Sequence, residues 1–395
     1  MALESVPHAI SIEHSLVLVY GGAAILGTIA LIARQVLPVV YIFLGALIGP
    51  GGFKLIPDLA IVDELANIGI IFLLFLLGMD LYPQKLLKIF QSVTVVTAAT
   101  SVLFFGLGFA VAFLFGFTIV EAVVTGVATG LSSTIIGIKL LPTTVLHHRH
   151  IGELMIGVLL LQDLLAIMAL IAIEELGQHA EFGLTVLRPL VTLPFYIWLA
   201  FLLERFVIRI LLQKFDQIHE YLFLMTIAWC LGMGYLATLF GLSHEIGAFV
   251  AGVALAASPI ARFIAERLHA IRDFFLVLFF VAVGAHFDSG AFADVVIPSM
   301  VLALLVLAIK PVAYRYFFGF IGEKSKTGWE CGFRLGQLSE FSILIVFIAS
   351  TSGVISAMVA DFLLVATVLT FIGSSYLIVF RYPSPVAVSD RLRRD

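Results

Sequence analysis

Charged side chains are scarce in this sequence. Asp, Glu, Lys and Arg make up 12% of its 395 residues, about half the share of an ordinary soluble domain. Hydrophobic residues make up 62%, and no stretch is polar enough to form a separate soluble domain. The composition therefore excludes a water-soluble globular protein and predicts a single transmembrane domain, residues 1–395, in a lipid bilayer. The net charge of −4 indicates no nucleic-acid partner.

Cysteine is nearly absent as well. Cys230 and Cys331 both lie in apolar stretches, where an isolated thiol behaves as a small hydrophobic side chain. This pattern predicts neither a disulfide framework nor a metal cluster. Because no nucleophile–base arrangement is visible, an enzyme is the least favoured class, and we expect no cofactor.

Long apolar runs are what the sequence has instead. A helix needs about 20 apolar residues to cross roughly 30 Å of hydrocarbon. By this measure the sequence predicts an all-α polytopic protein with thirteen spans. Their limits are 15–33, 37–50, 60–79, 92–116, 120–141, 151–174, 185–212, 219–240, 242–258, 270–287, 292–318, 328–350 and 355–380.

The basic residues test this count, because cytoplasmic loops are enriched in Lys and Arg. The loops after odd-numbered spans and the C-terminal tail hold most of the 22 basic residues. These are Arg34, Lys85, Lys88, Lys139, Arg149, Arg205, Arg209, Lys214, Arg262, Arg267, Arg272, Arg315, Lys324, Lys326, Arg381, Arg391, Arg393 and Arg394. The other loops hold only Lys54 and Arg188. The bias predicts an N-terminus outside and a C-terminus in the cytoplasm, and we expect the membrane to be the bacterial inner membrane.

Two pairs of similar segments predict an inverted repeat. Residues 74–80 (LFLLGMD) resemble 278–288 (LFFVAVGAHFD), and 129–134 (TGLSST) resemble 335–342 (LGQLSEFS). Each pair is separated by seven spans, so the halves 15–174 and 219–380 would have opposite orientations, joined by a linking helix at 185–212. Chance similarity between apolar helices is the alternative.

The segments 129–134 and 335–342 also predict interrupted helices, because Gly, Ser and Thr cluster there in the middle of a span. Unwound backbone at that depth is tolerated where it is buried in protein or lines a cavity, and it exposes helix ends that an ion can approach. Ser133 and Thr134 of the first segment are candidate ion ligands. A packing seam of small residues is the alternative.

Gln162 and Asp163 lie about 18 Å into the sixth span, near the membrane midplane. A carboxylate is costly there, and burial disfavours its charged form, so a proton and a cation would compete for one site. We therefore predict Asp163 as the carrier of H⁺ and of K⁺ or Na⁺, with the Gln162 amide as an oxygen ligand or as a group that orients the acid. A hydrogen bond from Asp163 to a neighbouring helix is the structural alternative.

Lys310 and Glu340 are the other candidate charges within the membrane. Lys310 would neutralise the carbonyl ends of the interrupted helices or pair with an acid such as Asp163, unless it extends to the cytoplasmic surface. Glu340 would complement the positive ends of the second interrupted helix, or pair with Arg334.

Six sequence blocks together resemble the monovalent cation:proton antiporter-2 family, and within it the Kef-type potassium efflux systems. They are 74–83, 131–134, 160–163, 247–256, 278–284 and 336–341, and they extend over nearly the whole chain. The resemblance implies a homodimer with the inverted-repeat, NhaA-like fold of sodium/proton antiporters and two crossing broken helices. Gln-Asp at 162–163 is the form found in Kef-type members, and Lys310, Glu340, Ser133 and Thr134 match family positions.

The function that this resemblance implies is electroneutral K⁺/H⁺ exchange. Kef-type proteins usually continue into a cytoplasmic nucleotide-binding regulatory domain, whereas this sequence ends at Asp395. We therefore expect no soluble regulatory domain within residues 1–395, whether the sequence is a truncated form or a member that lacks this domain. Gating by nucleotide or glutathione does not follow from the resemblance. The alternatives are a Na⁺/H⁺ antiporter of the same fold, a K⁺ channel-like efflux protein and, less favoured, an organic-anion transporter of the bile-acid type.

Overall fold

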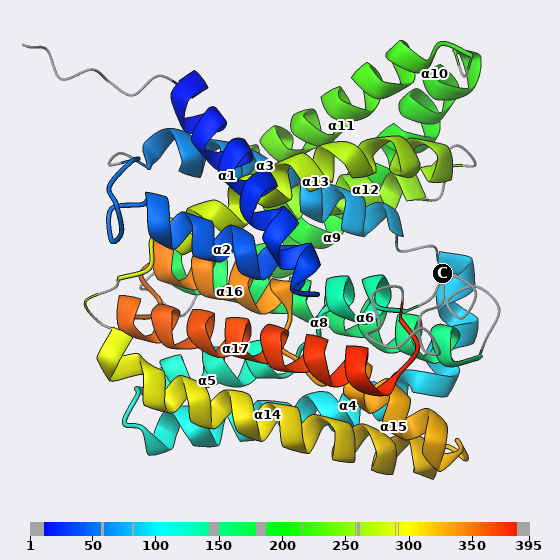
Figure 1. The fold of residues 1–395 in the computed structure, drawn as a ribbon. Coiled ribbons are helices and arrows are strands. Elements are labelled where there is room, and N and C mark those ends of the chain that lie inside the picture. Colours follow the sequence, from blue (N-terminus) through cyan, green and yellow to red (C-terminus); the bar gives the residue numbers. More distant parts are fainter. Residues whose placement is uncertain are drawn as a thin grey trace, which may run out of the picture. The chain divides into compact units, whose positions relative to one another are not determined.

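The computed structural model describes residues 12–384, apart from 57–58, 81–82, 142–149, 179–186, 216, 257, 259–260, 289 and 291. Helices form the regular secondary structure of these residues, which confirms the all-α class (Figure 1). They divide into two compact units, and each unit combines segments from both halves of the chain.

The first unit contains α1 to α3 and α9 to α13. The bounds are α1 Ile12–Ile32, α2 Leu37–Ile48, α3 Ala60–Asp80, α9 Leu187–Leu203, a π-helical segment Glu204–Ile208, α10 Arg209–Lys214, α11 His219–Leu239, α12 His244–Ala256 and α13 Ala261–Ala285. Helix α3 packs against both α12 and α13. Glycines allow this close approach, because a Cβ at Gly78 or Gly252 would overlap the backbone of the facing helix.

The second unit contains the remaining helices. The bounds are α4 Pro83–Leu114, α5 Ile119–Thr129, α6 Thr134–Lys139, α8 His150–Gln178, α14 Phe292–Phe320, α15 Ser325–Arg334, α16 Glu340–Thr351 and α17 Ala357–Arg381. Helix α14 packs along α15, α17 and α4, and α16 packs against α5, α8 and α17. Part of the core is an apolar cluster that includes Phe104, Val158, Tyr314 and Phe318. This cluster holds α4, α8 and α14 together.

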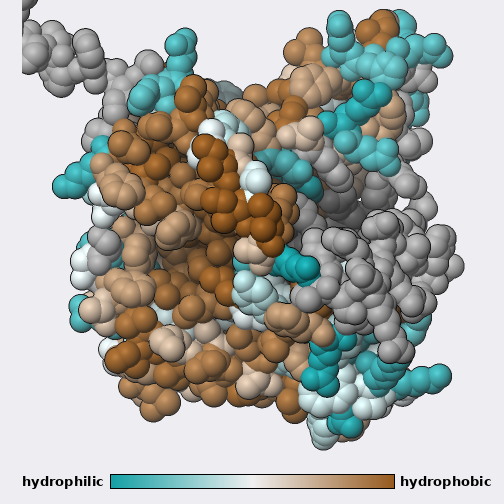
Figure 2. Space-filling model, in the orientation of Figure 1, coloured by the Kyte–Doolittle hydropathy of each residue, from teal (hydrophilic) through white to brown (hydrophobic). Residues whose placement is uncertain are grey.

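Seven of the described helices are long and apolar enough to cross a membrane, namely α1, α3, α4, α8, α11, α14 and α17. Large hydrophobic side chains cover their outer surfaces; on α14, for example, Leu304 is 64% exposed and Phe320 70%. Figure 2 shows this apolar surface, with hydrophilic side chains gathered near α10 and α15. The chain is therefore membrane-spanning, and the thirteen spans remain a prediction.

Two helices are longer than the apolar runs that predicted them. Helix α13 begins at Ala261 instead of residue 270, and α4 begins at Pro83 instead of residue 92. Both extra segments carry charged residues, which lower the local hydropathy although the backbone stays helical. Apolar runs therefore mark the part of a helix suited to hydrocarbon and not its full length.

Glu121 caps two helices of the second unit at once. Its Oε2 accepts hydrogen bonds from the Thr118 backbone N (3.0 Å) and Oγ1 (2.8 Å) at the start of α5. Its Oε1 accepts from the Ser356 backbone N (3.1 Å) and Oγ (2.6 Å) at the start of α17. One buried carboxylate therefore ties together two helix N-termini, where negative charge is favourable.

We expect Glu121→Ala to lower the free energy of unfolding by about 1–3 kcal/mol, because it removes the acceptor at both helix starts. The thermal midpoint in detergent, measured by the fluorescence of buried tryptophan, checks this. Glu220→Ala, an exposed glutamate in the first turn of α11, is the control. Equal midpoints for the two variants would contradict the capping role.

An ion pair joins α3 to the end of α13 within the first unit. His286 Nε2 lies 3.4 Å from Asp63 Oδ2, and His286 Nδ1 lies 2.9 Å from the Ala282 carbonyl oxygen. Both ring nitrogens thus face acceptors, which suits the protonated imidazolium.

We expect Asp63→Asn and His286→Gln each to lower the thermal midpoint in detergent, because each substitution removes one member of the pair that joins α3 to the end of α13. The double variant should lose little more than either single variant, since the two side chains act through the same contact. Losses that simply add in the double variant would rule out this role.

Candidate functional site

Helices are interrupted at both segments where the sequence predicts it. Helix α5 ends at Thr129 and α6 begins at Thr134, whereas α15 ends at Arg334 and α16 begins at Glu340. Hydroxyl groups cap the new helix starts. Ser133 Oγ accepts from the Ile136 backbone N at 3.1 Å, and Ser339 Oγ accepts from the Phe341 backbone N at 3.0 Å. A serine of each interruption therefore caps the helix that follows it.

The two interruptions contact each other. Ser342 Oγ donates to the Ala128 carbonyl at 2.6 Å, and Gln337 Nε2 lies 3.4 Å from the Ser133 carbonyl oxygen. Helix α17 supports the second interruption, because Ser374 Oγ donates to Gln337 Oε1 (2.8 Å) and Thr370 Oγ1 accepts from the Leu338 backbone N (3.1 Å). The unwound backbone is thus held by side chains of the same unit.

Lys310 on α14 lies between the two interruptions. Its Nζ donates to the Leu131 carbonyl of the first, to the Gln337 carbonyl of the second at 3.0 Å, and to Ser132 Oγ at 3.4 Å. The Phe104 ring lies 5.0 Å from the ammonium. Lys310 is fully buried, so it does not extend to the cytoplasmic surface, and its charge faces helix-end carbonyls.

Gln162 and Asp163 are buried on α8, with 1% and 3% of their surface exposed. Gln162 Nε2 donates to the Gly130 carbonyl at 3.1 Å and to the Tyr314 hydroxyl at 3.0 Å. Gln162 Oε1 and Thr134 Oγ1 are buried and form no hydrogen bond among the residues that the structure describes. Two of the predicted ligands therefore offer oxygen atoms that a bound cation would satisfy.

Glu340 is the first residue of α16 and is buried. Its negative charge lies at the positive end of the helix dipole, where it is stabilising. Arg334, its alternative predicted partner, bonds elsewhere. It donates to Glu330 Oε1 at 3.0 Å, to the Leu140 carbonyl beyond α6 at 2.8 Å and to the Pro383 carbonyl at 2.8 Å. The second interruption thus has a buried base before it and a buried acid after it.

Sequence reasoning missed Tyr314. Its hydroxyl accepts from Gln162 and lies 3.2 Å from Ser132 Oγ, so it connects α8 to the first interruption. The sequence does place Tyr314 four residues after Lys310, and residues four apart share a helix face. This spacing could have indicated that Tyr314 lies near the site. That spacing did not single it out among the aromatic residues of α14.

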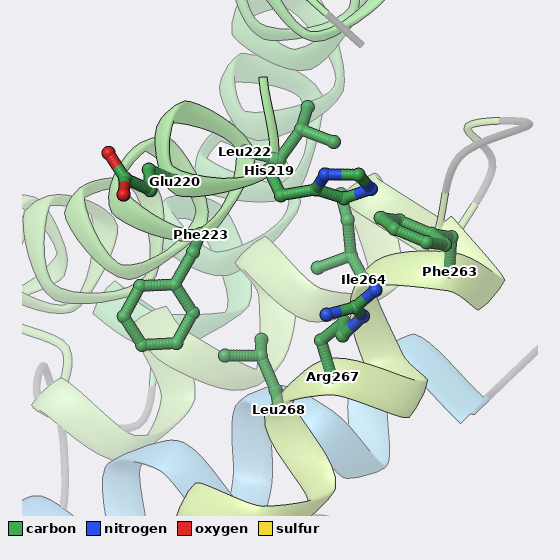
Figure 3. A pocket seen from close by; sticks show the side chains of 8 residues that line it. All are labelled: His219, Glu220, Leu222, Phe223, Phe263, Ile264, Arg267 and Leu268. Carbon is green, nitrogen blue, oxygen red and sulfur yellow. The ribbon is translucent and has the colours of Figure 1, made fainter. Parts of the chain in front are cut away.

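A separate pocket of about 340 Å³ lies within the first unit, between the N-terminal ends of α11 and α13. Figure 3 shows His219, Phe263 and Arg267 on one side of it, and Phe223 and Leu268 on the other. The residues predicted to bind the ion all belong to the second unit. This pocket is therefore not the predicted ion site.

Comparison with known proteins gives a consistent result. Residues 21–381 match the family described as sodium/hydrogen exchanger, transmembrane. K(+) efflux antiporter 4 of Arabidopsis thaliana is 28% identical over 85% of this chain and 58% of its own length. The glutathione-regulated potassium-efflux system protein KefC of Salmonella arizonae is 30% identical over 86% of this chain and 55% of its own. The chain thus spans little more than half the length of these relatives.

A solved structure shows a similar fold. The sodium proton antiporter MjNhaP1 from Methanocaldococcus jannaschii aligns with a TM-score of 0.70 at 17% identity, covering 92% of this chain and 94% of its own. The resemblance to Kef-type antiporters that the sequence blocks predicted is confirmed by these relatives.

We expect Lys310→Met to lower the free energy of unfolding by about 1–3 kcal/mol, because it leaves two buried carbonyls without a donor. Lys310→Gln, which keeps N–H donors, should lose less. Thermal midpoints in detergent check both, with exposed Lys326→Met as the control. If Lys310→Met were as stable as Lys326→Met, the ammonium would not be needed to hold the interruptions.

Proposed function

Because the chain belongs to the sodium/hydrogen exchanger family, we propose that it is a secondary active monovalent cation/proton antiporter that exchanges K⁺ for H⁺. The observation that carries this proposal is the buried Gln162–Asp163 pair, in which Gln162 bonds to the first of two contacting helix interruptions. Potassium is proposed as the cation because the relatives named above are potassium efflux proteins. Potassium efflux would be the direction of transport.

Asp163 is the proposed carrier. A single buried carboxylate is neutral when it binds either one proton or one monovalent cation, so the two ions replace each other without leaving a buried charge uncompensated. Gln162 Oε1 and Thr134 Oγ1 would supply neutral oxygen ligands, since both are buried without hydrogen-bond partners among the described residues. Ser133, whose hydroxyl caps α6, retains a further lone pair for an ion. The exchange would then be 1:1 and electroneutral.

Lys310 and Glu340 are proposed as supporting charges. Lys310 donates to both interruptions and so fixes the backbone around the site. Glu340 places a negative charge at the start of α16. Neither residue needs to contact the transported ion in this mechanism.

The inverted repeat remains part of the proposal. Its support is that α3 and α13, one predicted pair of equivalent helices, belong to the first unit. The other pair, α5–α6 and α15–α16, belongs to the second unit. Such a division suits alternating access, in which the two sides of the membrane reach the same midplane acid in turn. Thirteen spans, an outside N-terminus, a cytoplasmic C-terminus and a homodimer in the inner membrane complete the proposed architecture.

Sodium is the alternative cation, because the solved structure with a similar fold is that of a sodium proton antiporter. Proteoliposomes that contain a pH-sensitive dye distinguish the possibilities. Proton movement out of acid-loaded vesicles, seen as a change in dye fluorescence on addition of K⁺ but not of Na⁺, supports the proposal. A response to Na⁺ but not to K⁺ supports sodium exchange. Potassium current without coupled proton movement would indicate a channel.

We expect Asp163→Asn to abolish cation-dependent proton movement in these proteoliposomes, because Asn keeps the shape of Asp but cannot titrate. The size-exclusion profile in detergent should be unchanged, which shows that the variant still folds and assembles. Asp288→Asn, an exposed aspartate after α13, is the matched control and should retain exchange. Coupled exchange by Asp163→Asn would require a different carrier.

A further inference from the structure

We propose that Tyr314 is a positioning residue for the cation site, whose hydroxyl holds the Gln162 amide so that its carbonyl oxygen is directed to the ion. The inference rests on the proposed function and assigns a role to a residue outside the predicted ligand set. Tyr314 is fully buried on α14. Its hydroxyl lies 3.0 Å from Gln162 Nε2 and 3.2 Å from Ser132 Oγ.

The hydrogen bonds of Gln162 determine which way its amide points. The amide nitrogen carries two protons, and it faces the Gly130 carbonyl oxygen at 3.1 Å and the Tyr314 hydroxyl. A carbonyl oxygen can only accept, so the atom facing Gly130 must be the nitrogen. Rotating the amide by 180° would place two oxygens against each other. Oε1 therefore points away from both partners.

The direction of Oε1 matters because the two ends of an amide carry opposite partial charges. The N–H protons repel a cation, whereas the carbonyl oxygen attracts one. Gln162 Oε1 is buried and accepts no hydrogen bond from the described residues, and the same holds for Thr134 Oγ1. The contact with the Gly130 carbonyl therefore selects the orientation in which a dehydrated monovalent cation meets oxygen, and the Tyr314 hydroxyl accepts from the amide nitrogen and helps to hold it there.

The hydroxyl of Tyr314 is not explained by packing of its ring. The ring makes an edge contact with Phe104, with centroids 5.5 Å apart, and a stacked contact with Phe318 at 6.1 Å. Phenylalanine would keep both contacts. Only the hydroxyl reaches Gln162 and Ser132, so its removal separates the positioning role from the packing role.

The test is Tyr314→Phe in the full chain, assayed for potassium-dependent proton movement in proteoliposomes. We expect the KM for K⁺ to rise about threefold to tenfold, the effect of losing one hydrogen bond that orients a ligand. The kcat should stay within about twofold, because Asp163 and the helix interruptions are unchanged. Tyr316→Phe is the matched control, since Tyr316 lies on the same helix with 58% of its surface exposed. Its KM and kcat should be those of the wild type.

A binding measurement covers the case in which the variant reconstitutes poorly. The K⁺ concentration that gives half-maximal thermal stabilisation in detergent should rise in Tyr314→Phe by the same factor as KM. In a Gln162→Met background, Tyr314→Phe should add no further loss, because it acts through the amide.

An unchanged KM and an unchanged half-maximal concentration in Tyr314→Phe would overturn the inference, as would a fall in kcat alone. These outcomes are distinct from failure of the proposed function. If the wild-type protein shows no coupled cation and proton movement, the antiporter proposal itself is wrong. If the wild type exchanges and Tyr314→Phe matches it, only the role of Tyr314 is withdrawn.

Discussion

The second unit depends on one interaction, the ammonium of Lys310 shared between the carbonyls of two interrupted helices. Each interruption leaves backbone carbonyls without intrahelical donors, and hydrocarbon offers none. The Leu131 and Gln337 carbonyls come from opposite halves of the chain, and Nζ donates to both. One buried cation therefore makes it possible for two unwound segments to lie against each other inside the protein.

Arg334 is a second buried cation among the described residues of this unit. It pairs with Glu330 and also donates to the Leu140 carbonyl beyond α6 and to the Pro383 carbonyl after α17. Both positive charges thus bind backbone oxygens at helix ends, where a cation is favoured by the helix dipole. Side-chain oxygens of Gln162 and Thr134 keep their acceptor capacity. In this unit, the side chains of Lys310 and Arg334 thus hold the backbone in place. The oxygen atoms of Gln162 and Thr134 stay available for a transported cation.

The sequence predicted the helical class, the two interruptions and the burial of Asp163, because these follow from apolar length and from Gly, Ser and Thr within a span. It did not decide whether Lys310 points inward, since the same spacing allows an extended side chain to reach the surface. Nor did it distinguish Tyr314 from Tyr316. The first is fully buried and the second is 58% exposed, and this difference depends on the rotation of α14 within its packing. The family resemblance implied a dimerisation domain and a six-helix core, but the residues alone did not show which segments form each unit, because each unit joins segments that are distant in the chain.

The bonding of Lys310 bears on which residues take part in an exchange cycle. An ammonium has three N–H bonds, and the structure supplies three acceptors, the Leu131 and Gln337 carbonyls and Ser132 Oγ. Removing any one of these bonds would leave a buried acceptor without its donor. A lysine bonded in this way holds the two interruptions in place as part of the scaffold, and the proposed mechanism accordingly assigns the exchange of proton and cation to Asp163.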